Sequence, residues 1–119
     1  MANDITLEWS KLTPLTTEEV NKLNHNGIEG VYRISKKEID GKFYVIFVGS
    51  AINFKNELLT LLAGETGFLK QGGEFSFRYA PVKGEDKRKA IEKQMYKQYA
   101  PQYNAKEPVS SLDIKVNLN

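Results

Sequence analysis

The chain has 119 residues, which suits one domain with a buried core and is too short for two. Hydrophobic residues make up 40% of it, aromatic residues 11% and charged residues 27%, as in ordinary globular proteins. No stretch has the length of a membrane span or a signal peptide, so we expect a cytoplasmic protein with no membrane partner. With no cysteine and only one histidine, the chain lacks the residues for disulfides, thiol nucleophiles and Cys/His zinc sites, and a bound metal would need oxygen ligands.

The first predicted elements are a strand and a helix. Apolar and polar residues alternate over residues 5–9, which predicts a short half-buried strand. Thr16 and Glu19 then have the spacing of a capping box, so a helix should begin there and end before Gly27.

A β-hairpin is predicted next. Residues 30–35 and 42–48 are rich in β-branched and aromatic side chains, which favour strands. The polar segment between them contains Asp40-Gly41, a strong turn signal, and Gly49 is expected to end the second strand.

Four further elements follow the hairpin. Asn53 can cap a helix whose apolar residues recur at helical spacing as far as Gly64. Aromatic residues alternate over 75–79 and predict a strand, and 85–99 reads as a helix with acidic residues at its start. Apolar residues alternate again over 112–118, which predicts a strand added at the C-terminus.

The most informative feature of the sequence is an ordered set of short motifs. A first strand carries Gly-aliphatic-Tyr, a second carries aromatic-aliphatic-Gly, and a later helix bears one acidic residue before a Pro-x-Tyr-Asn string. In chain order these are Gly30-Val31-Tyr32, Phe47-Val48-Gly49, Glu92 and Pro101-Gln102-Tyr103-Asn104. This order and spacing resembles the GIY-YIG nuclease superfamily, with a degenerate second motif.

The resemblance implies a fold as well as a function. It covers residues 27–104 and implies an α/β (α+β) sandwich, in which a small, mainly antiparallel central sheet is flanked by helices. Residues 1–119 would then form a single domain, with strands added to the core at both ends.

The same resemblance implies metal-dependent phosphodiester hydrolysis. Such nucleases use tyrosine hydroxyls on the two motif strands, an arginine on the following helix and one glutamate that holds a divalent cation. Carried over by position, Tyr32 supplies the first hydroxyl, Glu92 is the ligand for Mg²⁺ or Mn²⁺, and Asn104 is the trailing asparagine. Phe47 falls on the second tyrosine and Lys55 falls on the arginine.

These two departures leave enzymatic activity open. Phe47 cannot exchange a proton, and losing a catalytic base costs roughly 10²–10⁴-fold in rate. Lys55 offers a point charge where a guanidinium would hold phosphate with two hydrogen bonds. The alternatives are a nucleic-acid-binding module without hydrolysis, or a protein-interaction domain that uses exposed terminal strands.

The distribution of charge favours a nucleic-acid partner, with DNA expected rather than RNA. Residues 1–29 carry five acidic against two basic side chains, whereas residues 30–119 carry fifteen basic against ten acidic. Lys89, Lys93 and Lys97 recur at helical spacing and are the candidate nucleic-acid contacts, although such a stripe is also typical of a solvated helix face. We expect sequence specificity to come from a protein partner.

Several residues also have a purely structural interpretation. Tyr32 would then be a core side chain with its hydroxyl at the rim of the sheet, and Glu92 would be a helical partner of Arg88. Asn104 would be a turn residue. The sequence alone does not decide between these interpretations.

Overall fold

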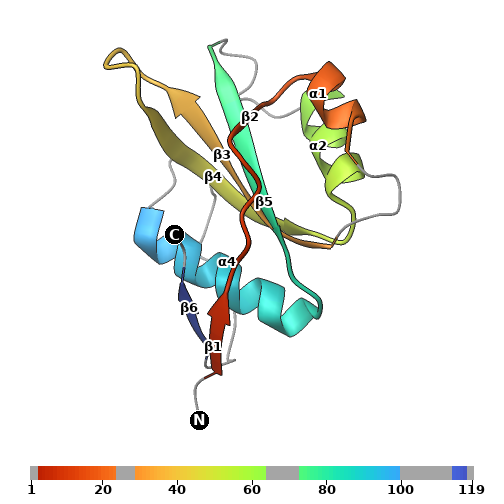
Figure 1. Cartoon of the computed structure of the whole chain (residues 1–119), viewed down its shortest axis with the longest axis vertical. Helices are drawn as coiled ribbons and strands as arrows, with labels where there is room; N and C mark the ends of the chain where they lie inside the picture. The colour runs from red at the N-terminus through yellow and green to blue at the C-terminus, as the bar shows by residue number, and fades with distance from the viewer. Residues whose placement is uncertain (1–2, 24–28, 64–72, 100–113, 118–119) are drawn as a thin grey trace.

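The protein is a three-layer structure in which one antiparallel sheet lies between two layers of helix (Figure 1). The computed structural model describes residues 3–23, 29–63, 73–99 and 114–117. The sheet has four strands, which are β2 (Thr13–Pro14), β3 (Gly30–Lys37), β4 (Phe43–Ala51) and β5 (Phe75–Pro81). They lie in the order β2-β5-β3-β4, and each pair of neighbours is antiparallel. The predicted α+β architecture is confirmed.

The β3–β4 hairpin forms where the sequence predicted it, with a longer second strand. Gly41 has φ +83°, which suits glycine, and the Lys42 N–H donates to Asp40 Oδ1 at 2.9 Å to close the turn. Pairing continues as far as Gly30 opposite Ala51, so β4 passes through Gly49, where it was expected to end. A strand ladder joins backbone groups, and a glycine can belong to it without a side chain.

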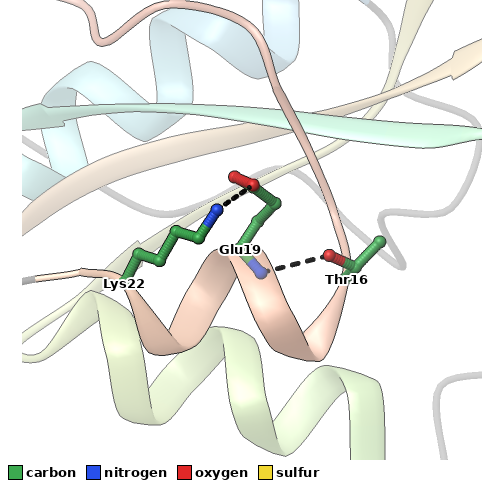
Figure 2. Close-up of polar contacts among 3 residues, drawn as sticks. All are labelled: Thr16, Glu19 and Lys22. Atoms are coloured by element: carbon green, nitrogen blue, oxygen red, sulfur yellow. Dashed lines mark hydrogen bonds and ion pairs between the residues drawn. The ribbon is translucent and has the colours of Figure 1, made fainter.

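Helices α1, Thr17–Asn21, and α2, Phe54–Ala63, lie together on one face of the sheet (Figure 1). In α1 the Glu19 N–H donates to Thr16 Oγ1 at 3.1 Å, as the capping box predicts. The reciprocal bond of the capping box is absent, because the Glu19 carboxylate pairs with Lys22 Nζ at 2.9 Å instead (Figure 2). The Thr16 N–H donates to the Pro14 carbonyl.

Helix α4, Glu85–Tyr99, covers the opposite face of the sheet and has the bounds expected from the sequence. Ile91 and Met95 are fully buried against it. Arg88 is buried too, and its guanidinium forms an ion pair with Glu29 just before β3, which ties the helix to the start of the central strand.

Strands also form at both ends of the chain, and they pair with each other. β1, Asn3–Thr6, and β6, Ile114–Asn117, make a separate parallel two-stranded sheet (Figure 1). β1 lies earlier than the predicted strand at residues 5–9, and Leu7 and Trp9, which follow it, pack in the α4 layer. Each terminal strand therefore pairs with the other along one of its two edges, and the protein-interaction alternative stays open.

The sheet has a hydrophobic core on each face. The core beneath α1 and α2 includes Val20, Tyr32, Ile34, Phe54, Leu58 and Phe77. The core beneath α4 includes Val31, Val48, Ala80, Val82, Ile91 and Met95. Among the described residues, no helix is long and apolar enough to cross a membrane.

Candidate functional site

Tyr32, the tyrosine of the first motif, is a buried side chain with a charged partner. It lies on β3 with 1% of its surface exposed, and its ring packs edge-on against Phe54 with the ring centroids 6.3 Å apart. Its hydroxyl donates to Glu57 Oε2 at 2.7 Å. A buried tyrosine hydroxyl normally has a hydrogen-bond partner, and here that partner is a carboxylate from α2.

The motif glycines are explained by the space that surrounds them. Gly49 lies directly opposite Tyr32 in the β3–β4 pairing, and a Cβ at Gly49 would be 2.6 Å from Tyr32 Oη and 2.7 Å from Cζ. A Cβ at Gly30 would be 2.1 Å from the Ala80 carbonyl oxygen and 2.8 Å from the Val82 nitrogen. One glycine therefore lets β5 approach the start of β3, and the other leaves room for the Tyr32 hydroxyl.

Glu57 is the site residue that the sequence interpretation missed. Phe54 and Leu58 are buried and fix the orientation of α2, so that the half-buried Glu57 between them faces Tyr32. A sequence signal existed, because Glu57 is an acidic residue that borders the apolar stripe of its helix. Its partner, however, lies 25 residues earlier and is defined only by the docking of α2 on the sheet.

Glu92 approaches the same place from the other helical layer. It lies half-buried on α4 and accepts a hydrogen bond from Ser50, the residue after Gly49. Burial raises the pKa of Glu92, and the charge of Glu57 raises it further, whereas the Ser50 hydrogen bond and Lys89 lower it. Although α4 covers the opposite face, Glu92 therefore reaches Ser50 on β4, next to the second motif.

Tyr32, Glu57 and Glu92 are electrostatically coupled, and we call them the Tyr32–Glu57–Glu92 group. The pKa of Tyr32 is raised well above its ordinary value, first by burial, then by the charge and hydrogen bond of Glu57, and then by the charge of Glu92. The tyrosinate form of Tyr32 is therefore disfavoured. Residues from β3, α2 and α4 thus act on one another across both sides of β4.

The other predicted site residues are placed differently. The Phe47 ring lies beside Tyr32, with the centroids 6.2 Å apart, and its role at the site stays a prediction. Lys55 Nζ donates to the Asn21 carbonyl of α1 at 3.3 Å, and its predicted role at the site stays a prediction. Asn104 lies outside the described residues.

The candidate nucleic-acid contacts share a helix with Glu92. Lys89 and Lys97 are exposed and Lys93 is half-buried, all on α4. Lys89 is close enough to Glu92 for its charge to lower the pKa of that carboxyl. Binding of nucleic acid by this stripe stays a prediction.

The oxygen atoms of the group fit a hard divalent cation. Glu92 and Glu57 offer carboxylates, and Tyr32 and Ser50 offer hydroxyls close by. The described residues contain no cluster of three or more acidic or histidine side chains that could hold a metal alone. Mg²⁺ commonly binds through only one or two carboxylates and completes its coordination with water and substrate phosphate, so the donors present are suitable.

Comparison with known proteins shows the fold. The sequence matches no protein family and no curated protein. Three crystal structures are similar to it, all point mutants of the GIY-YIG N-terminal endonuclease domain of UvrC from Thermotoga maritima bound to its catalytic divalent cation. Their TM-scores are 0.55, 0.53 and 0.50 at 22–23% identity, covering 75% of this chain and 98% of theirs. The chain therefore has a GIY-YIG-like fold.

Proposed function

We propose that this domain processes nucleic acid by divalent-metal-dependent hydrolysis of phosphodiesters, at the Tyr32–Glu57–Glu92 group. The observation that carries the proposal is the coupling of a buried tyrosine hydroxyl to two carboxylates from different helices. Ordinary core packing does not favour such a group, because two half-buried carboxylates repel each other unless a cation or a proton joins them.

The Tyr32–Glu57 hydrogen bond supplies a route for a proton. An attacking water gives a proton to Tyr32 Oη as the Tyr32 proton passes to Glu57 Oε2, so tyrosinate never forms and Glu57 ends as the neutral acid. The water oxygen forms the new bond to phosphorus, the bond to the leaving oxygen breaks, and the leaving oxygen takes a proton from solvent. This relay also makes a hydroxyl at Phe47 unnecessary for removal of the proton.

Glu92 is the proposed ligand of Mg²⁺ or Mn²⁺. Such a cation, when bound, neutralises charge that develops on phosphate oxygens. Ser50 orients the Glu92 carboxylate through its hydrogen bond, and Glu57 increases the negative potential that attracts a cation.

The proposed substrate is DNA, approached from the side of α4. Lys89, Lys93 and Lys97 would contact its phosphates, which makes binding dependent on salt. A protein partner supplying specificity and a cytoplasmic location complete the proposal.

A nucleic-acid-binding module without hydrolysis is the second candidate. The observation that favours it is the charge of α2, which presents the carboxylate of Glu57 to Tyr32 while its Lys55 ammonium contacts α1. Without a cationic side chain from α2, orientation of the phosphate would depend on the metal and on the lysines of α4.

A cleavage assay with branched DNA and Mn²⁺ separates these candidates. Wild type should cleave, whereas Glu57→Gln and Glu92→Gln should each lose at least about 10²-fold, because one removes the proton acceptor and the other the ligand charge. Glu18→Gln, which removes one exposed carboxylate from α1, is the matched control and should cleave normally. Salt-dependent binding without cleavage would favour the binding module, and no binding at low salt would favour protein interaction.

Two further variants test the placement of Phe47 and Lys55. Phe47→Tyr should raise cleavage, because its ring already lies beside Tyr32 and a hydroxyl there adds a second proton route. Lys55→Arg should leave cleavage unchanged, because the side chain is directed to Asn21. The opposite pattern would show that Lys55 faces the substrate.

A further inference from the structure

A second polar feature lies on the α4 face of the sheet, away from the Tyr32 hydroxyl. It is a pocket of about 270 Å³, lined in part by Arg33, Ser35, Phe43, Val45, Arg78 and Tyr99. These residues come from β3, β4, β5 and the last turn of α4, so the pocket is built on the centre of the sheet rather than on a loop. The function proposed above makes no use of it.

Two arginines meet in this pocket. Arg33 and Arg78 are directly opposite each other in the β3–β5 pairing, and both are half-buried. Like charges placed directly across a ladder destabilise a sheet, and Arg78 adds to the effect of burial in lowering the pKa of Arg33. No acidic residue lines the pocket among the residues that the structure describes. The pair therefore carries a cost in stability that a bound anion would offset.

The guanidinium of Arg33 is held in a fixed orientation. Its Cζ lies 4.4 Å from the centre of the Trp9 ring and 5.3 Å from that of Tyr99, and Nη1 donates to the Tyr99 hydroxyl. These contacts restrict the guanidinium fork, and a restricted fork loses little entropy when it binds a tetrahedral oxyanion.

The rest of the pocket lining includes apolar side chains that can contact an organic group next to the anion. Phe43 and Val45 on β4 are apolar, and Ser35 adds a hydroxyl beside the arginines. The pocket lining is thus rich in donors, as a phosphate site requires.

We propose that this pocket binds a phosphate group, held between Arg33 and Arg78, with the organic part of the ligand against Phe43 and Val45. Its volume exceeds that of a phosphate alone and suits one nucleotide unit, either free or within a strand. Binding at this pocket is independent of the hydrolysis proposed above, because the pocket contains no residue of the Tyr32–Glu57–Glu92 group.

NMR titration in the presence of a chelator tests the pocket without any cleavage. Inorganic phosphate, thymidine monophosphate and a short single-stranded oligothymidylate are each added to the ¹⁵N-labelled chain. Saturable shifts should centre on Arg33, Ser35, Arg78 and Tyr99, and the monophosphate should bind more tightly than phosphate. Tightest binding by the oligonucleotide would identify a strand as the source of the phosphate, and equal binding would identify a free nucleotide.

Variants make the test specific to the arginine pair. Arg78→Met keeps the apolar stem and should weaken monophosphate binding at least about tenfold, because a charged hydrogen bond is lost. Lys87→Met removes the same charge from an exposed site about 18 Å along α4 from Tyr99 and should change binding less than about twofold. Arg78→Lys keeps the charge and should fall between them, which also covers the case in which Arg78→Met does not fold.

Three results would overturn the proposal. Shifts confined to the lysines of α4 would assign the binding to that stripe. Equal weakening by Lys87→Met would show attraction by net charge alone. No saturable shift with any of the three ligands would mean that the pocket is not a phosphate site, whatever the outcome of the cleavage assay.

Discussion

Gly49→Ala tests whether the second motif keeps its glycine to make room for Tyr32. The new methyl would be 2.6 Å from Tyr32 Oη and 2.7 Å from Cζ, whereas ordinary contacts are 3.4–4 Å. Tyr32 is 1% exposed and its hydroxyl is bound to Glu57, so the ring cannot withdraw without losing buried contacts or that hydrogen bond.

The expected loss follows from two opposing effects. Overpacking at a buried site costs about 1–3 kcal/mol. Replacing glycine also reduces the entropy of the unfolded chain, which offsets about 0.4–1 kcal/mol. At the middle of these two ranges the net loss in the free energy of unfolding is about 1.3 kcal/mol, seen as a fall in Tm of roughly 5 °C for a chain of this length.

Urea unfolding of a double-mutant cycle measures the effect and its cause. In a Tyr32→Leu background the ring and hydroxyl are absent, so Gly49→Ala should cost about 1 kcal/mol less than it does in wild type. Gly30→Ala should be worse in both backgrounds, because its methyl meets the backbone of Ala80 rather than a side chain. Costs for Gly49→Ala and Tyr32→Leu that add within about 0.3 kcal/mol would refute the reasoning.

Three other predictions concern stability measured by thermal or urea unfolding. Thr16→Ala should lower the free energy of unfolding by about 1 kcal/mol, because the Glu19 N–H loses its hydrogen bond to the Thr16 side chain. An unchanged Tm would show that this hydrogen bond does not stabilise the protein. Glu29→Ala should lower the free energy of unfolding by about 2–3 kcal/mol, because it leaves the buried guanidinium of Arg88 unpaired. Arg88→Met removes that guanidinium and should cost less, and a larger loss for Arg88→Met than for Glu29→Ala would contradict this reasoning. Glu92→Gln, without divalent cations, should stabilise the protein at pH 7. The pKa of Glu92 is raised in the folded state, so its ionised form lowers the stability of the protein above that pKa. The stability gained by Glu92→Gln should therefore vanish as the pH falls below the ordinary pKa of 4.5. A gain in stability that is independent of pH would contradict this cause.

Much of the fold was predictable because its signals are local. The β3–β4 hairpin follows from a turn sequence between two β-rich runs, and α4 follows from acidic residues at its start and apolar residues at helical spacing. The pairing of β1 with β6 was not predictable, because it joins the two ends of the chain. The extension of β4 through Gly49 was missed because the position of a strand end depends on the partner strand.

The candidate site was predictable only in part. Tyr32 and Glu92 were named from motif order, and the charge of Glu92 raises the pKa of Tyr32, while their roles at the site stay predictions. The contribution of α2 was not predictable, because Lys55 and Glu57 are two residues apart and so point about 200° apart around the helix. Only the burial of Phe54 and Leu58 shows which of the two faces Tyr32.

The central claim is that Tyr32, Glu57 and Glu92 form one site for a divalent cation, and Mn²⁺ binding measured by electron paramagnetic resonance tests it most directly. Wild type should show saturable binding at a single site. Glu92→Gln should weaken that binding at least about tenfold, because it removes the ligand charge, while Glu18→Gln should bind as wild type does. Mn²⁺ binding that is the same in Glu92→Gln and wild type, or no saturable binding in wild type, would contradict the account.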